Sequence, residues 1–219
     1  MASAQQALLF LRKFVKHGRR VASFAPSSQA LSRAATQRLD PTRPQNVVEL
    51  GAGTGAVTSI ALARMHPQGR LLAIELDHDF AAVLRKRCPG AFVVEDDAAT
   101  LRGHLRARRM SSIDLVISGL PLPSVPSDVT REILATFREL ASAHAFFSQL
   151  TIMPLVFLPF YRRLFHEVSF QWAFWNFPPA GVYHCRGVRD TFALYLRERG
   201  RTSQLRLTPW TSGDLGQRA

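Results

Sequence analysis

Short apolar runs alternate with amphipathic stretches through the middle of the chain. The runs have the length of buried strands, and apolar residues recur at helical spacing in the stretches between them. The pattern predicts strands at 46–50, 71–75, 91–95 and 113–118. It predicts helices at 55–66, at 80–87, at about 98–108, and from Ser127 or Asp128 to about 143. Four strand–helix units in series predict a Rossmann-like α/β fold, a doubly wound and mostly parallel sheet with helices on both faces.

Towards the C-terminus the apolar runs follow one another more closely. They are predicted as strands at 145–152, 168–175 and 190–196, with 181–185 leading into the last. A parallel sheet commonly ends in an antiparallel edge, so these strands are expected to form such an edge here. The residues after Arg199 are polar and are predicted to form a loose tail.

The stretch 145–161 carries no formal charge, which makes it a candidate for a membrane span. It is shorter than the roughly 20 apolar residues that a spanning helix needs. It also contains Pro154 and Pro159. We therefore predict a strand that runs into an apolar loop rather than a span.

The N-terminal region is predicted to hold two amphipathic helices, at about 4–17 and 29–38. The first has apolar residues on one side and basic residues largely on another, a pattern typical of helices that lie in a membrane interface. Its predicted membrane contacts are Leu8, Leu11, Arg12, Lys13, Phe14 and Lys16. The alternative is a helix that packs on its own domain. Ser27 or Ser28 is expected to cap the second helix.

The charge of the chain indicates an anionic partner. The 219 residues include 28 Lys and Arg against 16 Asp and Glu, a net charge of +12. A protein this basic is attracted to nucleic acid or to an anionic membrane surface. The length suits one α/β domain, which we place at 44–200, after an N-terminal helical segment at 1–43 and before a polar tail at 201–219. The two cysteines have no metal-ligand or disulfide-framework spacing, which favours a reducing compartment.

A glycine-rich turn follows the first strand of the predicted sheet. Residues 49–55 read Glu-Leu-Gly-Ala-Gly-Thr-Gly, at a strand end of the kind where open α/β sheets bind ligands. The turn lacks the Gly-Lys-Ser/Thr ending of a phosphate loop, and Glu49 would repel a pyrophosphate but suits a cation. Glu75 ends the second strand, where it can accept both ribose hydroxyls, and Asp97 follows the third, where it can accept from an adenine amino group. Together these residues resemble the motifs of class I methyltransferases, which bind S-adenosylmethionine.

The loop after the fourth strand indicates the methyl acceptor. In adenine and glutamine methyltransferases this loop is Asn/Asp-Pro-Pro-Tyr, which holds a planar amino group by hydrogen bonds and stacking. Here it reads Ser118-Gly119-Leu120-Pro121 and has neither the amide nor the aromatic ring. We therefore expect a flexible alkyl amine, whose lone pair must point at the methyl group in a dry pocket.

Five pieces spread along the chain resemble bacterial phospholipid N-methyltransferases, which are related in fold to ribosomal RNA adenine dimethylases. The pieces are Phe-Ala-Pro-Ser-Ser at 24–28, the turn at 49–55, Ser-Gly-Leu-Pro-Leu at 118–122, Gln-Leu-Thr at 149–151 and Asn-Phe-Pro-Pro-Ala at 176–180. The resemblance implies methylation of phosphatidylethanolamine, through its mono- and dimethyl forms, to phosphatidylcholine. It also implies a cytoplasmic enzyme without a metal, held on the inner face of the membrane by its N-terminal helix. The chain departs from the family at Ile152-Met153, where the family has tyrosine and glycine.

The motifs and the resemblance together assign the site residues. The expected cofactor-binding residues are Ala25, Ser27, Ser28, Glu49, Gly51, Gly53, Thr54, Gly55, Glu75, Leu76, Asp97, Ala98 and Ser118. The candidate catalytic residues, which would orient the amine or relay its proton, are Ser118, Gly119 and Tyr183. The candidate substrate-binding residues are Phe24, Leu120, Pro121, Arg162, Arg163, Trp175 and His184. The two arginines are expected to meet the lipid phosphate, or else to form a surface pair, and residues 154–165 to line an acyl-chain groove.

Two alternative functions remain open on the sequence. An RNA adenine N6-dimethyltransferase would explain the basic charge and the fold, but the planar-amine loop and a separate C-terminal RNA-binding module are missing, so we expect no nucleic acid partner. A non-catalytic lipid- or cofactor-binding protein is disfavoured by the three acids Glu49, Glu75 and Asp97.

Overall fold

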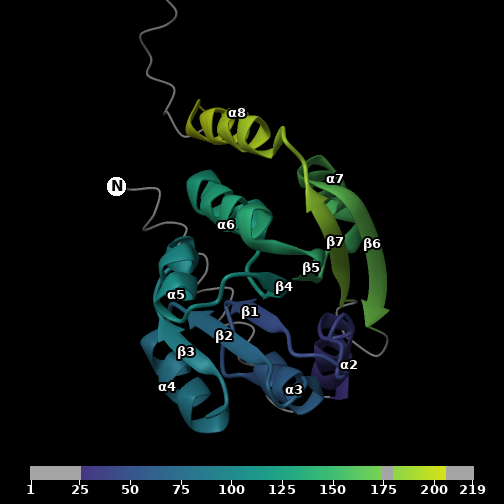
Figure 1. Ribbon diagram of the computed structural model, residues 1–219. Coiled ribbons are helices and arrows are strands. Elements are labelled where there is room, and N and C mark those ends of the chain that lie inside the picture. Colours follow the sequence, from purple (N-terminus) through teal and green to yellow (C-terminus); the bar gives the residue numbers. More distant parts are fainter. Residues whose placement is uncertain (1–25, 174–179, 206–219) are drawn as a thin grey trace, which may run out of the picture.

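The computed structural model describes residues 26–173 and 180–205 (Figure 1). The side chains of residues 26–28 and 201–205 are not described. The predicted interfacial helix at 4–17, together with Phe24, Ala25 and Trp175, therefore lies outside the described residues.

A seven-stranded sheet forms the centre of the molecule, in the order β3-β2-β1-β4-β5-β7-β6 (Figure 1). Its first five strands are parallel, and β7 pairs antiparallel with both β5 and β6. The strands are β1 (Asn46–Leu50), β2 (Arg70–Glu75), β3 (Phe92–Glu95), β4 (Ile113–Ser118), β5 (Ala141–Thr151), β6 (Phe165–Ala173) and β7 (Ala180–Val188). The predicted fold class is confirmed, including its antiparallel C-terminal edge.

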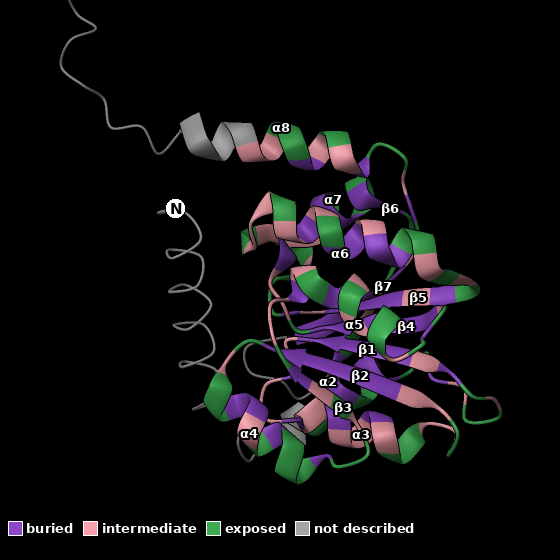
Figure 2. Ribbon diagram, turned by 60° about the vertical axis from the view of Figure 1, so that its left-hand side comes forward, coloured by how far each residue is buried: buried purple, intermediate pink, exposed green. Residues whose placement is uncertain are grey.

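Helices cover both faces of this sheet, so that the central strands are mostly buried (Figure 2). The helices are α2 (Pro26–Ala35), α3 (Ala56–Arg64), α4 (His78–Arg87), α5 (Leu101–Ala107), α6 (Ser127–Leu140), α7 (Pro154–Leu164) and α8 (Phe192–Leu205), with 3₁₀ turns η1 (Ala98–Thr100) and η2 (Leu122–Ser124). One apolar core lies between the sheet and α5 to α8, and the other lies between the sheet and α2 to α4. The alternation of side chains along each strand supplies both cores, as in β1, where Val48 and Leu50 enter the first and Val47 enters the second.

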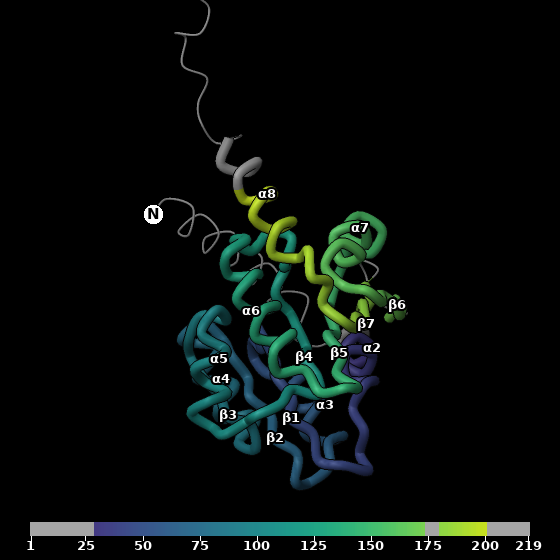
Figure 3. The backbone as a smooth tube through the Cα atoms, turned by 45° about the horizontal axis from the view of Figure 1, so that its top comes forward, coloured from purple at the N-terminus to yellow at the C-terminus, as the bar shows by residue number. Residues whose placement is uncertain are grey.

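The predicted strand at 190–196 is wrong, because this stretch begins α8. Phe192 and Leu196 are buried one helical turn apart, and Leu194 between them is exposed. This spacing suits a helix that lies across α6 (Figures 1 and 3). The helix continues to Leu205, past the predicted tail boundary at 200.

The predicted apolar loop after β5 is also wrong, because residues 154–164 form α7. Pro154 occupies the start of the helix, where its fixed φ is favourable and its missing N–H is not needed. Pro159 lies inside the helix, which continues through it and buries Phe160, Tyr161 and Leu164 against the sheet. No helix within 26–173 or 180–205 is long and apolar enough to cross a bilayer.

Candidate active site

The glycine-rich turn lies at the carboxyl end of β1, as the sequence predicts. Gly51, Gly53 and Gly55 have φ values of 69°, 57° and 85°. These left-handed conformations are strained for residues with a Cβ, so glycine permits the sharp turn. Gly55 is also the N-cap of α3, and the turn is pinned to β2 where the N–H of Gly51 donates to the Ile74 carbonyl at 2.9 Å.

Glu75 fastens the turn from the neighbouring strand. Its Oε2 accepts a hydrogen bond from the N–H of Gly53 at 2.7 Å, and its Oε1 accepts from the N–H of Asp77 at 2.9 Å. The carboxylate is therefore held rigidly between the ends of β1 and β2, with the exposed Leu76 beside it. A fixed carboxylate at this strand end suits recognition of a ribose. The sequence did not predict its two hydrogen bonds to backbone N–H groups.

Glu49 is a buried carboxyl that lacks a full set of partners. Its Oε2 has no hydrogen-bond partner within the described part of the chain. Burial raises the pKa of Glu49 to about 8; the charge of Glu75 acts in the same direction, and the hydroxyl of Thr58 opposes it. An unpaired buried carboxylate is costly, so a cation placed beside it would stabilise the ionised form.

Asp97 and Ala98 mark the third strand end of the site. Asp97 follows β3 and caps η1, since its Oδ1 accepts from the N–H of Ala99 at 2.8 Å. Ala98 is buried in the core that contains α5. The three predicted acids thus come to one edge of the sheet, on the neighbouring strands β1, β2 and β3.

The loop after β4 lies directly against the glycine-rich turn. The N–H of Gly119 donates to the Leu50 carbonyl at 2.9 Å. A Cβ on Gly119 would lie 2.8 Å from the carbonyl oxygen of Gly51, and a Cβ on Gly51 would lie 2.7 Å from Leu120 Cδ2. Only glycine allows the two loops to approach this closely. The predicted cofactor and acceptor loops therefore lie against each other.

Gln149 on β5 holds the acceptor loop, and it was not among the predicted site residues. Its Nε2 lies within hydrogen-bonding distance of the carbonyl oxygens of Ser118 (3.0 Å), Leu120 (2.8 Å) and Leu150 (2.9 Å), which share its two hydrogens. Its Oε1 and the hydroxyl of Ser118 are buried without hydrogen-bond partners among residues 26–173 and 180–205. The signal in the sequence was the Gln-Leu-Thr piece at 149–151, which includes this glutamine.

Tyr183 and His184 do not share a site, because consecutive residues of β7 point to opposite faces of the sheet. Tyr183 is fully buried on the α7 side, its ring lies against Tyr161 and Phe170, and its hydroxyl donates to the carbonyl of Pro154. Burial raises the pKa of Tyr183 to about 12, so the phenol stays protonated at neutral pH.

His184 belongs to a buried network on the other face. Its Nδ1 lies 2.9 Å from the Ser148 hydroxyl, and its Nε2 lies 3.2 Å from Gln171 Oε1. Burial, helped by the charge of Arg38, lowers the pKa of His184 to about 4, so the ring is neutral. The structure gives His184 a packing environment rather than a place beside the acceptor loop.

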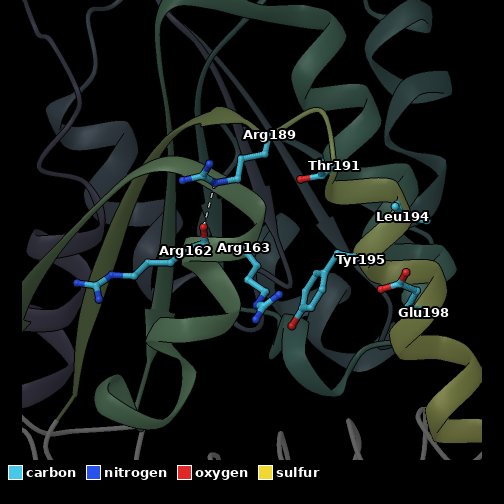
Figure 4. A pocket seen from close by; sticks show the side chains of 7 residues that line it. All are labelled: Arg162, Arg163, Arg189, Thr191, Leu194, Tyr195 and Glu198. Atoms are coloured by element: carbon cyan, nitrogen blue, oxygen red, sulfur yellow. Dashed lines mark hydrogen bonds between the residues drawn. The ribbon is translucent and has the colours of Figure 1, made fainter.

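Arg162 and Arg163 lie at the far end of α7 from the acceptor loop. They line a cavity of about 340 Å³ (Figure 4) with Arg189, Thr191, Leu194, Tyr195 and Glu198. Arg189 Nε donates to the Arg162 carbonyl at 3.0 Å. Arg162 comes eight residues after Pro154, about 12 Å along a helix. The structure thus places these arginines about two helical turns from the end of α7 that adjoins β5, and their contact with the lipid phosphate stays a prediction.

Comparisons with known proteins identify the family. No protein-family model matches the chain. The Ornithine lipid N-methyltransferase of Singulisphaera acidiphila is 43% identical over 187 residues, which cover 84% of this chain and 97% of that protein. The chain belongs to the family of lipid N-methyltransferases. Ribosomal RNA small subunit methyltransferase A of Acidobacterium capsulatum matches less, at 36% identity over 49% of this chain and 36% of that protein.

Solved structures agree with the methyltransferase fold. The O-methyltransferase TomG of Streptomyces achromogenes, in complex with S-adenosylmethionine, gives a TM-score of 0.58 at 16% identity over 85% of this chain and 90% of that one. A TehB-like S-adenosylmethionine-dependent methyltransferase of Corynebacterium glutamicum gives 0.54 at 13% identity over 84% and 98%. The cofactor of this lipid N-methyltransferase is S-adenosylmethionine, and the left-handed glycines and the unpaired Glu49 fit such a cation.

Proposed function

We propose that this methyltransferase methylates the side-chain amine of an ornithine lipid. The observation that carries the proposal is the similarity to the Singulisphaera acidiphila protein, which extends over 97% of that protein's length. Ornithine carries a primary amine at the end of a flexible alkyl chain. This is the kind of acceptor expected for a loop without planar recognition.

The geometry of the acceptor loop supports an alkyl amine. Gln149 fixes the carbonyls of Ser118 and Leu120 against the cofactor turn, so the loop presents backbone acceptors in a rigid arrangement. Backbone carbonyls can accept from a tetrahedral amine in more than one methylation state. We assign Ser118 and Gly119 to orienting the amine, and Leu120 and Pro121 to excluding water around it.

The reaction needs positioning more than covalent help. When bound, S-adenosylmethionine supplies an electrophilic methyl group on a sulfonium. An alkyl amine is protonated in water, and an apolar pocket favours its neutral form, which has a free lone pair. The nitrogen–carbon bond forms as the carbon–sulfur bond breaks, and the methylated ammonium loses its proton to solvent. The residues of this chain hold the two partners in line.

Phosphatidylethanolamine is the second candidate, because five sequence pieces resemble phospholipid N-methyltransferases. It also presents a primary alkyl amine, and its methylation would lead towards phosphatidylcholine. In this reading Arg162 and Arg163, which line the cavity at the end of α7, would meet the lipid phosphate. For either lipid, we propose a cytoplasmic enzyme on the membrane surface, held there by the basic segment 4–17 that the sequence predicts to be helical.

Mixed micelles that contain both lipids test the choice. The purified protein is incubated with S-adenosylmethionine, and each lipid is examined for added methyl groups by mass spectrometry. We expect methylated ornithine lipid at the higher rate. Methylation of phosphatidylethanolamine alone would overturn the choice of lipid, and methylation of neither would overturn the proposed function.

A further inference from the structure

Large apolar side chains are exposed together at the start of α7. Among the described residues nine large hydrophobic side chains are exposed, and four of them fall within 152–156. These are Ile152 (44% exposed), Met153 (45%), Leu155 (79%) and Val156 (60%), which we call the apolar tip. A cluster of this kind marks a binding surface, because single exposed apolar residues are ordinary and contiguous ones are not.

The apolar tip lies beside the candidate active site. It follows directly on β5, whose last residue is Thr151 and which carries Gln149 two residues earlier. Thr151 pairs with Gly181 of β7, and Gly181 pairs with the 43% exposed Trp172 of β6. Two strand spacings separate Thr151 from Trp172, about 10 Å. Trp172 thus adds an exposed aromatic side chain at the same end of these strands as the apolar tip.

The backbone of the apolar tip is fixed to the core of the protein. A fixed backbone suits a surface that inserts into a bilayer without a change of fold. The hydroxyl of Tyr183 donates to the carbonyl of Pro154, the first residue of α7. Phe160, Tyr161 and Leu164 bury the opposite end of the helix in the core. Leu155 and Val156 are therefore presented outward from an anchored helix.

The lack of acidic residues in the sequence around the apolar tip favours an anionic bilayer as its partner. The sequence from residue 140 to 166 contains no Asp or Glu, and Arg162 and Arg163 lie within it at the opposite end of α7 from the tip. The whole chain carries a net charge of +12. An apolar surface inside an acid-free, basic stretch suits a bilayer with anionic lipid, which attracts nearby Lys and Arg and accepts apolar side chains at its interface.

We propose that the apolar tip inserts into the interface of an anionic bilayer, so that the amine pocket opens directly onto the lipid surface. The inference rests on the proposed function, since it gives the lipid substrate a short route from the bilayer to the acceptor loop. The tip is a second membrane contact, separate from the predicted helix at 4–17. It does not span the bilayer, because α7 has only 11 residues.

Vesicle binding by paired surface variants tests the tip. Leu155→Ser with Val156→Ser removes its two most exposed side chains, and Val83→Ser with Leu194→Ser removes two exposed apolar side chains from α4 and α8. Sedimentation uses vesicles of phosphatidylglycerol and phosphatidylethanolamine. We expect partitioning at least about tenfold weaker for the tip variant and unchanged for the control variant. Equal partitioning of the tip variant and the unchanged protein would overturn the proposal.

The fluorescence of Trp172 provides a second test, which detects insertion directly and needs no substitution in the apolar tip. Replacing Trp175 and Trp210 by Phe leaves it as the single tryptophan. Lipids brominated along their acyl chains should quench its fluorescence when vesicles bind. Absence of quenching in vesicle-bound protein would contradict insertion at this edge.

Two further measurements separate this inference from its rivals. The tip variant should lose a larger share of its methylation rate on vesicles than on lipid in detergent micelles. If the unchanged protein methylates no lipid in micelles, the proposed function fails while vesicle binding still decides the tip. A dimer that the tip substitutions convert to a monomer, with vesicle binding unchanged, would assign the tip to self-association and overturn the proposal.

Discussion

The side chain of Gln149 reaches from β5 to the loop after β4, where its Nε2 donates to the Ser118 carbonyl at 3.0 Å. The same nitrogen donates to Leu120 at 2.8 Å, so one amide fixes both sides of Gly119. The N–H of Gly119 in turn donates to the carbonyl of Leu50, within the glycine-rich turn at 49–55. Gln149 therefore connects the loop after β4 to the glycine-rich turn. In our proposal it is a positioning residue, which contacts neither S-adenosylmethionine nor the lipid amine.

Replacing Gln149 by Met keeps its length and removes its donors. We expect the free energy of unfolding to fall by about 1–3 kcal/mol, because buried carbonyls lose partners. We also expect kcat/KM to fall about tenfold or more, because the acceptor loop loses its fixed position. Gln171→Met is a matched control, since Gln171 pairs with His184 away from this loop. Equal losses of activity in the two variants, measured at equal stability, would contradict the positioning role.

Gly119→Ala tests the close approach of the two loops. Its Cβ would meet the Gly51 carbonyl oxygen at 2.8 Å, so one loop must shift. We expect stability to fall by about 1–3 kcal/mol, with much weaker cofactor binding in calorimetry. Gly103→Ala in α5 is the control, because a Cβ there meets nothing within 4 Å and should stabilise the helix by about 0.5–1 kcal/mol. Undiminished cofactor binding by Gly119→Ala would show that the loops can separate.

The raised pKa of Glu49 predicts a pH dependence with a definite sign. Its ordinary pKa of 4.5 becomes about 8 in the folded protein without ligand. Between these values the folded state holds a proton that the unfolded state has released, so this group lowers stability as pH rises from about 4.5 to 8. A bound cation reverses the preference, so cofactor affinity should rise as pH increases through about 8.

Glu49→Gln removes this titration. Relative to the unchanged protein, we expect the variant's melting temperature without ligand to fall less between pH 6 and 9. We expect its affinity for S-adenosylmethionine to be at least about tenfold lower at pH 8.5 and nearly independent of pH. Parallel pH profiles for the two proteins would show that Glu49 is not the titrating group.

Tyr183→Phe distinguishes a packing role from a catalytic one. The hydroxyl donates to Pro154 inside the protein, so we expect a loss of about 1 kcal/mol in stability and an unchanged pH profile of kcat. A proton relay at the reacting amine would instead lower kcat by about a hundredfold or more and change that profile. The latter result would restore the catalytic role predicted from the sequence.

The sequence predicted that three acidic residues come together at the carboxyl ends of neighbouring strands. Glu49 lies one residue before the end of β1, Glu75 ends β2 and Asp97 comes two residues after β3. Parallel strands bring such positions to the same side of the sheet. The helix α7 was missed because Pro154 and Pro159 indicate helix breaks, although a proline at the first helical position is favourable. The start of α8 was missed because Phe192 to Leu196 is a continuous apolar run, which periodicity alone does not assign.

Contacts between segments that are distant in the chain could not be predicted from the sequence. The sequence around Gln149 does not show that its amide lies against the carbonyls of Ser118, Leu120 and Leu150. Likewise, placing Arg162 and Arg163 with the substrate followed from their nearness in sequence to an apolar segment. A helix in that segment carries them to its opposite end, into the cavity with Arg189 and Tyr195.

The most direct test of the central claim is the fate of the transferred methyl group. The purified protein is incubated with methyl-labelled S-adenosylmethionine in one reaction that contains both lipid micelles, with ornithine lipid and phosphatidylethanolamine, and ribosomal RNA. The lipid and RNA fractions are then separated and counted. The account predicts label in the lipid fraction, on the headgroup amine, and none above background in RNA. Label in RNA, with none in lipid, would contradict it.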